Sequence, residues 1–192
     1  NVPYRYDSES TDWPGTDPAW LAEHLERMKR AVERDKNHCS IIMWSTGNES
    51  SHGENHVAMI DWVRAKDSSR LVHCEDANRR GENRNADVYS RMYLSPEKTE
   101  EAARNYNLDR PVFLCEYAHA MGNSTGNLRE FYDIFERSPH MQGGFIWDWV
   151  DQGIIEPGGI VLYGGDFGDK PNLHAFCMNG IVMSDRTLTP KY

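Results

Sequence analysis

The sequence predicts an α/β fold built from parallel βα units, and three observations support this prediction. Short apolar runs alternate along the chain with amphipathic stretches of helical periodicity. The apolar runs are rich in β-branched residues and too short to span a membrane, so they indicate strands buried on both faces. No GxGxxG or GxxxxGK[ST] motif occurs, which disfavours a nucleotide-binding fold. A doubly wound sheet and a (β/α)8 barrel both fit this pattern.

The first predicted helix begins near Pro18, which suits a first turn, with Thr16 and Asp17 as cap candidates. Its apolar face is Leu21, Leu25, Met28 and Val32. The next elements are strand 40–44, helix 54–67, strand 70–75, strand 86–93, helix 95–107, strand 111–117, helix 127–137 and strand 143–150. These are about five strands, fewer than the eight of a complete barrel. A Gly- and Asp-rich loop region is predicted over residues 152–192.

Charge and cysteine content limit the classes of partner and site. The chain has 192 residues, a formal net charge of −9 and no Lys- or Arg-rich block. This acidic balance disfavours nucleic acid and anionic membranes as partners. Four cysteines occur without a CxxC pair, which disfavours a zinc ribbon or a redox motif. Free thiols suit a reducing compartment, so a cytoplasmic location is expected.

Two glutamates occupy equivalent places behind two predicted strands. Glu49 follows strand 40–44 by a few residues, and Glu116 directly follows the run PVFLC. The carboxyl ends of barrel strands carry the chemistry of (β/α)8 enzymes, so in a barrel these two acids would meet at one mouth. Paired carboxylates are what glycoside hydrolysis requires. The alternative is that each acid only stabilises the start of the next helix; their equivalent placement favours the catalytic pair.

Residues near these acids could bind a sugar. Asn48 could donate to a sugar hydroxyl, and the rings of Trp147 and Trp149 could stack on a pyranose face. His119 could bind a ligand hydroxyl, and Tyr93 could reach a carboxylate. The alternative for Tyr93 and for the tryptophans is core packing, which is slightly favoured for Trp149. The alternative for His119 is a structural or solvated histidine.

Other chemistries have weaker signals. His52 and His56 have the spacing of two metal ligands on one helix face, but no third ligand is evident nearby. No GxSxG motif occurs, so a serine nucleophile is not indicated.

Five strings together resemble the catalytic TIM barrel of β-galactosidases of glycoside hydrolase family 2. They are RDKNHCSIIMWSTGNESSHG, LCEYAHAMGNSTG, QGGFIWDWVDQG, YGGDFGDKPN and FCMNGIV. The resemblance covers most of the chain and is weakest over residues 77–109. It implies that residues 1–192 are part of the catalytic (β/α)8 barrel of a larger multidomain glycosidase. The part present would be the C-terminal half or somewhat more, about strands 4 to 8.

The resemblance also implies roles for individual residues. Glu49 would be the general acid/base and Glu116 the nucleophile of a retaining mechanism on terminal non-reducing β-D-galactosides. The sugar-binding residues implied are Asn48 at the 2-hydroxyl, Tyr93 against the nucleophile, His119 on the galactose hydroxyls and Trp147 as a stacking platform. Two other readings stay open. One is a non-catalytic carbohydrate-binding or structural piece, and the other is a hydrolase of β-glucuronides or β-mannosides.

The resemblance also implies that the parent enzyme binds two metal ions, sodium and magnesium. Phe176, through its carbonyl, and Asn179 would help to hold sodium, and Glu49 would be a magnesium ligand. The family's other magnesium ligands are expected upstream of Asn1, so this chain is not expected to hold magnesium well. Cys39 stands where the family usually has a proline.

Oligomerisation and activity are expected to differ between the parent enzyme and this chain. The resemblance implies a homo-oligomeric parent. The isolated chain is expected to show little or no activity and to self-associate, because a partial barrel leaves unpaired strand edges and an uncovered apolar face.

Overall fold

Two α/β units make up the chain in the computed structural model. The structure describes residues 13–192, except residue 51, residues 79–84 and residues 105–108. The first unit covers Asn1–Ser90 and the second covers Arg91–Tyr192.

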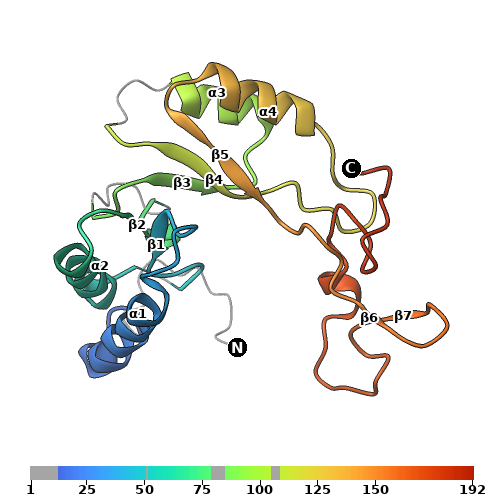
Figure 1. Cartoon of the computed structure of the whole chain (residues 1–192), viewed down its shortest axis with the longest axis horizontal. Coiled ribbons are helices and arrows are strands. Elements are labelled where there is room, and N and C mark those ends of the chain that lie inside the picture. Colours follow the sequence, from blue (N-terminus) through green and yellow to red (C-terminus); the bar gives the residue numbers. More distant parts are fainter. Residues whose placement is uncertain (1–12, 51, 79–84, 105–108) are drawn as a thin grey trace. The chain divides into compact units, whose positions relative to one another are not determined.

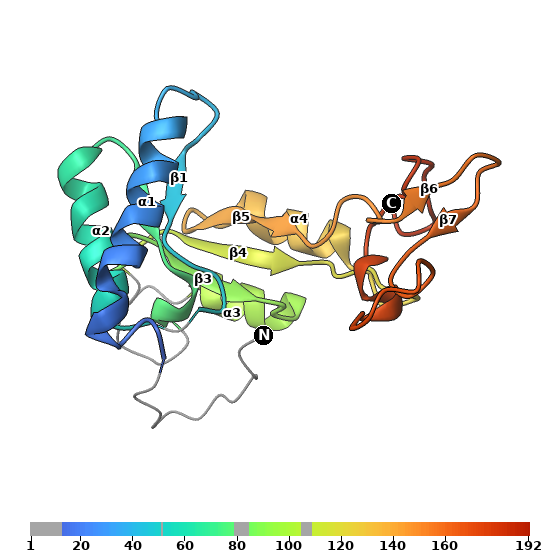
Figure 2. The same cartoon turned by 90° about the horizontal axis from the view of Figure 1, so that it is seen from below.

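A parallel pair of strands and two helices form the first unit. Strand β1 (Met43–Ser45) pairs in parallel with β2 (Leu71–His73), and helix α2 (Glu54–Lys66) connects them as the crossover of a βαβ unit. Helix α1 (Leu21–Asp35) precedes β1 and packs against α2. Figures 1 and 2 both show the two helices next to each other. The unit therefore has the helix–strand order that the sequence predicts.

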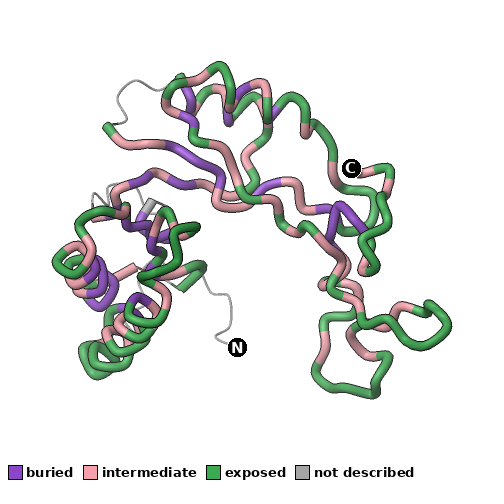
Figure 3. The backbone as a smooth tube through the Cα atoms, in the orientation of Figure 1, coloured by how far each residue is buried: buried purple, intermediate pink, exposed green. Residues whose placement is uncertain are grey.

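The hydrophobic core of the first unit lies between these helices and strands. Its main side chains come from all four elements and the start of the next turn: Met28, Val32, Trp44, Met59, Ile60, Val63, Val72 and Cys74. Figure 3 shows the corresponding buried stretches along both helices. Burial of such a side chain stabilises the fold by about 1.5–3 kcal/mol. Of the predicted apolar face of the first helix, Met28 and Val32 lie in this core and Leu25 packs against it, whereas Leu21 at the start of α1 is exposed.

Helix α1 begins where the sequence predicts, with a tighter first turn. The Asp17 carboxylate accepts the backbone amide of Ala19 at 2.9 Å and caps a short 3-10 turn, Pro18–Trp20. The α-helix then starts at Leu21. Proline suits this place because the first turn needs no amide donor from it.

Three strands and two helices form the main part of the second unit. The strands have the order β3 (Tyr89–Met92), β4 (Val112–Tyr117) and β5 (Met141–Ile146), and β4 and β5 are parallel. Helices α3 (Pro96–Arg104) and α4 (Leu128–Arg137) lie side by side on one side of β4 and β5 (Figure 1).

Aromatic packing fixes α4 against the end of β4. Phe131 and Ile134 are buried on the inner face of α4. The Tyr117 ring meets the Phe131 ring edge to face at 5.2 Å between centroids, and the Phe135 ring at 5.6 Å. Glycine is required at Gly144 on β5, because a Cβ there would lie 2.9 Å from the Tyr117 ring. This contact sets the end of β4, which carries Glu116.

The predicted loop region after β5 contains a little regular structure. Strands β6 (Ile154–Ile155) and β7 (Val161–Leu162) form a short antiparallel hairpin, and a 3-10 turn covers His174–Cys177. The rest of this region consists of turns and irregular backbone, as its Gly and Asp content predicts.

Strand ends differ from the predicted ones because pairing decides them. Strand β1 starts at Met43 rather than residue 40, since only Met43–Ser45 pairs with β2. Strand β5 covers Met141–Ile146 rather than 143–150, because its pairing with β4 ends at Ile146. The last residues of the predicted helix 95–107 lie outside the described residues. Within the described part of the chain, no helix is both long and apolar enough to cross a membrane.

Two buried histidines predict that the fold loses stability in mild acid. Burial lowers the pKa of His56, which is 1% exposed, to about 4, and the nearby His24 and His52 add to this. Burial also lowers the pKa of His73 to about 4. The unfolded chain binds these protons near pH 6.5, so the free energy of unfolding should fall between about pH 6.5 and pH 4. We expect urea unfolding to show a loss of about 2 kcal/mol per histidine between about pH 7 and pH 5.

Glutamine variants identify the source of this pH dependence. His56→Gln and His73→Gln should each weaken it, whereas His38→Gln, at an exposed position, should leave it unchanged. An unfolding free energy that stays constant over this pH range would show that these histidines are not held neutral by the fold.

Candidate active site

Glu116 and Tyr93 are joined at the ends of neighbouring strands. Glu116 is the penultimate residue of β4, and Tyr93 directly follows β3. The Tyr93 hydroxyl donates to Oε2 of Glu116 at 2.5 Å, and the Tyr93 amide donates to the Glu116 carbonyl at 2.9 Å. Tyr93 has a φ of 51°, a conformation that is unfavourable for a residue with a Cβ and is often found at functional sites. The Glu116 carboxylate is therefore oriented by a tyrosine from the next strand.

His119 contacts both Tyr93 and residues of the C-terminal region. Its ring centroid lies 6.0 Å from that of Tyr93 and 5.8 Å from that of Phe176. Its Nε2 lies 3.4 Å from the side-chain amide nitrogen of Asn179. The second unit thus brings together Tyr93, Glu116, His119, Phe176 and Asn179, which are far apart in sequence.

Asn179 is a buried residue with an open acceptor. It is 2% exposed, and its backbone carbonyl accepts the amides of Ala120 at 3.2 Å and Asp148 at 3.0 Å. Its side-chain Oδ1 is buried and has no hydrogen-bond partner among the described residues. Because a buried polar atom normally finds a partner, this oxygen fits a cation or a ligand hydroxyl.

Trp147 lies directly behind β5 and close to the end of β4. Its backbone amide donates to the carbonyl of Tyr117 at 2.8 Å, and its side chain is 40% exposed. Trp149 is 50% exposed and meets Tyr192 edge to face at 6.1 Å. The slight preference for core packing of Trp149 is therefore wrong, because this ring lies at the surface rather than in a core.

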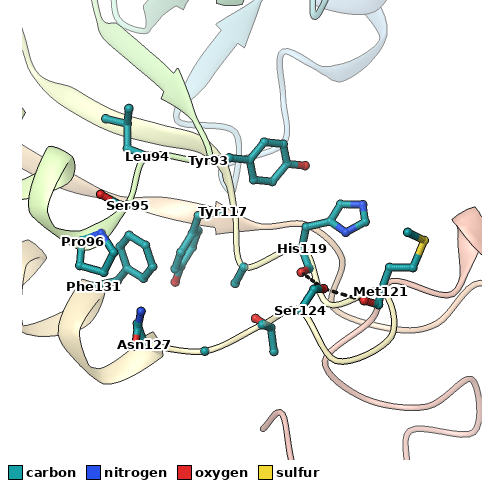
Figure 4. A pocket seen from close by; sticks show the side chains of 13 residues that line it. Tyr93, Leu94, Ser95, Pro96, Tyr117, His119, Met121, Ser124, Asn127 and Phe131 are labelled. Carbon is teal, nitrogen blue, oxygen red and sulfur yellow. Dashed lines mark hydrogen bonds between the residues drawn. The ribbon is translucent and has the colours of Figure 1, made fainter.

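A cavity of about 520 Å³ opens beside this group. Figure 4 shows Tyr93 and His119 on one side of it, and Tyr117, Phe131 and Asn127 on the other. The loop after β4 is ordered by Ser124, whose single hydroxyl proton is shared between the carbonyls of His119 at 2.9 Å and Met121 at 2.6 Å.

Asn48 and Glu49 belong to the first unit, in the turn after β1, and both are exposed. Glu49 has a φ of 49°, in the same left-handed region as Tyr93. It does not cap helix α2, because the N-cap is Gly53 and the acid of the first turn is Glu54. The helix-start interpretation of Glu49 is therefore wrong.

Two further carboxylates next to Glu49 were not singled out from the sequence. Glu75 and Asp76 lie just after β2, separated from it by Cys74, and they accept the backbone amides of Glu49 at 3.3 Å and Ser50 at 2.6 Å. Their position in the sequence could have identified them, because they follow a predicted strand, as Glu49 and Glu116 do.

The histidine spacing does not produce a metal centre in the described part of the chain. His56 lies in α2 but His52 precedes it, so the two do not share a helix face, although their ring centroids are 5.9 Å apart. No group of three or more His, Cys, Asp or Glu side chains among the described residues is arranged to hold a metal ion.

The strings that surround these residues match a known family along nearly the whole chain. The sequence model of the TIM barrel domain of glycosyl hydrolases family 2 matches residues 3–192. The chain belongs to glycosyl hydrolases family 2. Two curated β-galactosidases support this membership. The chain is 46% identical over 192 residues to that of Priestia megaterium, and 46% identical over 190 residues to that of Lactobacillus delbrueckii subsp. bulgaricus.

The chain aligns with only a part of the length of those two relatives. The two alignments take in 98% and 97% of this chain but 18% of each relative's length. The residues that the chain shares with them are therefore a segment of their TIM barrel domain.

Two solved structures share the fold. A β-glucuronidase of Ruminococcus gnavus aligns with a TM-score of 0.58 at 17% identity, over 90% of this chain and 34% of its own. A β-glucuronidase of Lactobacillus rhamnosus gives 0.57 at 19% identity, over 91% and 35%. The expectation of a TIM-barrel fold, present in part, is confirmed, and the doubly wound alternative is set aside.

Proposed function

We propose that this chain carries both catalytic carboxylates of a retaining β-galactosidase. The observation that carries the proposal is the hydrogen bond from Tyr93 to Glu116, which orients a carboxylate at the end of a strand of a family 2 barrel. The β-galactosidase relatives favour galactose as the sugar. In this proposal residues 1–192 form part of the catalytic barrel, about its strands 4 to 8, and Glu49 and Glu116 act in the same reaction.

In the first step Glu116 acts as the nucleophile. One oxygen of its carboxylate accepts the Tyr93 hydroxyl, and the other attacks the anomeric carbon. The glycosidic C–O bond breaks as the new C–O bond to Glu116 forms, which gives a covalent galactosyl-enzyme. The hydrogen bond from Tyr93 fixes the angle of attack, and a positioned nucleophile needs no reorganisation at the moment of reaction.

Glu49 completes both steps as a proton carrier. In the first step its protonated carboxyl donates to the departing glycosidic oxygen, so that the aglycone leaves as a neutral alcohol. In the second step its carboxylate takes a proton from water, and the water oxygen displaces Glu116 from the anomeric carbon. The configuration of the sugar is retained because two inversions follow one another.

The neighbouring residues would bind the sugar. Asn48 precedes the acid and would donate to the 2-hydroxyl, and His119 would bind further ring hydroxyls. The exposed Trp147 ring would offer a flat apolar surface to the pyranose. All three are polar or amphipathic groups near strand ends, where barrel enzymes bind substrate.

Sodium fits the residues of the second unit. The orphaned, buried Oδ1 of Asn179 is a hard oxygen ligand, and the Phe176 carbonyl would be its companion. When bound, sodium supplies a positive charge to which a sugar hydroxyl can bind. Magnesium would take the Glu49 carboxylate as one of its hard oxygen ligands.

Substrate comparison with the complete enzyme tests this proposal. We expect the kcat/KM for p-nitrophenyl β-galactoside to exceed that for the β-glucuronide and the β-mannoside, and the first-formed sugar to be the β-anomer by NMR. Faster cleavage of the glucuronide or the mannoside would show that the substrate is that sugar rather than galactose. The absence of cleavage of all three would favour a carbohydrate-binding role.

A further inference from the structure

We propose that Glu75 and Asp76 are positioning residues that hold the proton carrier Glu49 through backbone amides. This inference rests on the proposed function, because it assigns Glu49 to proton transfer. It adds two buried residues whose carboxylates bond to backbone amides. They lie on the short 3-10 turn Glu75–Asn78, which begins two residues after the end of β2.

Three hydrogen bonds connect the turn 47–50, here called the Glu49 turn, to this 3-10 turn. The amide of Glu49 donates to Oε2 of Glu75 at 3.3 Å, and the amide of Ser50 donates to Oδ2 of Asp76 at 2.6 Å. In the opposite direction the amide of Glu75 donates to the carbonyl of Gly47 at 3.2 Å. Two consecutive amides of the Glu49 turn are thus held by two consecutive carboxylates.

The Glu49 turn needs such support because its backbone is unfavourable on its own. Glu49 has a φ of 49°, and a residue with a Cβ keeps this conformation only where its surroundings enforce it. The turn is also tight, since a Cβ on Gly47 would lie 2.2 Å from the Ser50 hydroxyl oxygen. Without the two acceptors, the amides of Glu49 and Ser50 would lose the bonds that select this conformation.

Burial separates the supporting carboxylates from the reacting one. Glu75 is 1% exposed and Asp76 is 7% exposed, whereas the side chain of Glu49 lies at the surface of the unit. A buried carboxylate is retained where hydrogen bonds compensate its lost hydration, and bonds to a charged acceptor are stronger than neutral ones. The backbone under Glu49 is therefore fixed while its carboxyl remains accessible, as a group that must reach a glycosidic oxygen requires.

Leaving-group dependence in the complete enzyme tests this role. For Glu75→Ala we expect kcat/KM for a methyl β-galactoside to fall about 10- to 100-fold, because its poor leaving group needs a well-placed acid. The kcat/KM for 2,4-dinitrophenyl β-galactoside should stay near that of the wild type, because this leaving group needs no proton. Its kcat should fall, since the second step needs a base, and azide should restore it with formation of β-galactosyl azide. Glu75→Gln keeps an acceptor oxygen and should recover most of the loss.

Amide exchange gives a second readout, and Asp61→Asn on the exposed face of α2 is the matched control. Hydrogen exchange at Glu49 should accelerate in Glu75→Ala, and at Ser50 in Asp76→Ala, while Asp61→Asn changes neither exchange nor kinetics. If Glu75→Ala does not fold, Asp76→Ala carries the same comparison.

Two outcomes would overturn the inference. One is an equal loss of kcat/KM on methyl and dinitrophenyl substrates without azide rescue, since a merely destabilised protein behaves in that way. The other is unchanged exchange at Glu49 and Ser50. A wild-type enzyme that cleaves no galactoside would instead refute the proposed function, and the exchange experiment would still decide whether the two carboxylates hold the turn.

Discussion

Glu116→Gln is expected to abolish turnover of β-galactosides by the complete enzyme. The amide that replaces the carboxylate is a very weak nucleophile, so no galactosyl-enzyme can form, and kcat should fall by about four orders of magnitude or more. The loss should be the same for good and poor leaving groups, because both need the nucleophile. Steady-state assays with aryl and alkyl β-galactosides measure this directly.

Tyr93→Phe is the matched control for this variant. It keeps the nucleophile and removes the Tyr93 hydroxyl, which donates to Glu116 at 2.5 Å. The expected loss is about 10- to 100-fold in kcat, the usual effect of one hydrogen bond to a charged group. If Glu116→Gln retained rates near those of Tyr93→Phe, Glu116 would not be the nucleophile.

Glu49→Gln is expected to separate substrates by their leaving group. The variant cannot protonate the departing oxygen, so alkyl galactosides should lose about two to four orders of magnitude in kcat/KM. The kcat/KM for 2,4-dinitrophenyl β-galactoside should change little, because dinitrophenolate leaves without a proton. Its kcat should drop, since no base activates the water that releases galactose.

Azide is the diagnostic addition to the Glu49→Gln variant. As an anion it attacks the galactosyl-enzyme without a base, so it should raise kcat and yield β-galactosyl azide. Asp61→Asn should show neither the loss nor the rescue. A Glu49→Gln enzyme that lost all substrates equally, and that azide left unchanged, would contradict the assignment of Glu49 as acid/base.

The fold could be predicted well from the sequence because hydrophobic spacing and the core agree. Met28 and Val32 of α1, and Phe131 and Ile134 of α4, are at helical spacing in the sequence and buried in the structure. Strand ends could not be predicted, because hydrogen-bond pairing decides them. The exposure of Trp149 could not be predicted either, because its apolar ring indicated a core position although the residue is half exposed.

Only a part of the site could be predicted from residue types. Glu116 stands out as an acid behind an apolar run, and the structure adds the hydroxyl of Tyr93 that reaches it from the next strand. The link from Glu49 to Glu75 could not be predicted, since backbone-to-carboxylate bonds leave no motif in a sequence. The left-handed backbone of Glu49 could not be predicted either, because Gly, Asn and Asp are the residues that indicate such a conformation, and Glu is not.

A fluorinated substrate should trap the covalent bond between Glu116 and galactose. The complete enzyme is incubated with 2,4-dinitrophenyl 2-deoxy-2-fluoro-β-galactoside, digested and analysed by mass spectrometry. The fluorine slows both steps and the dinitrophenolate restores the first, so the intermediate accumulates. We expect one 2-deoxy-2-fluorogalactosyl group on the side chain of Glu116. Labelling of a different residue, or release of dinitrophenolate without any labelled peptide, would contradict it.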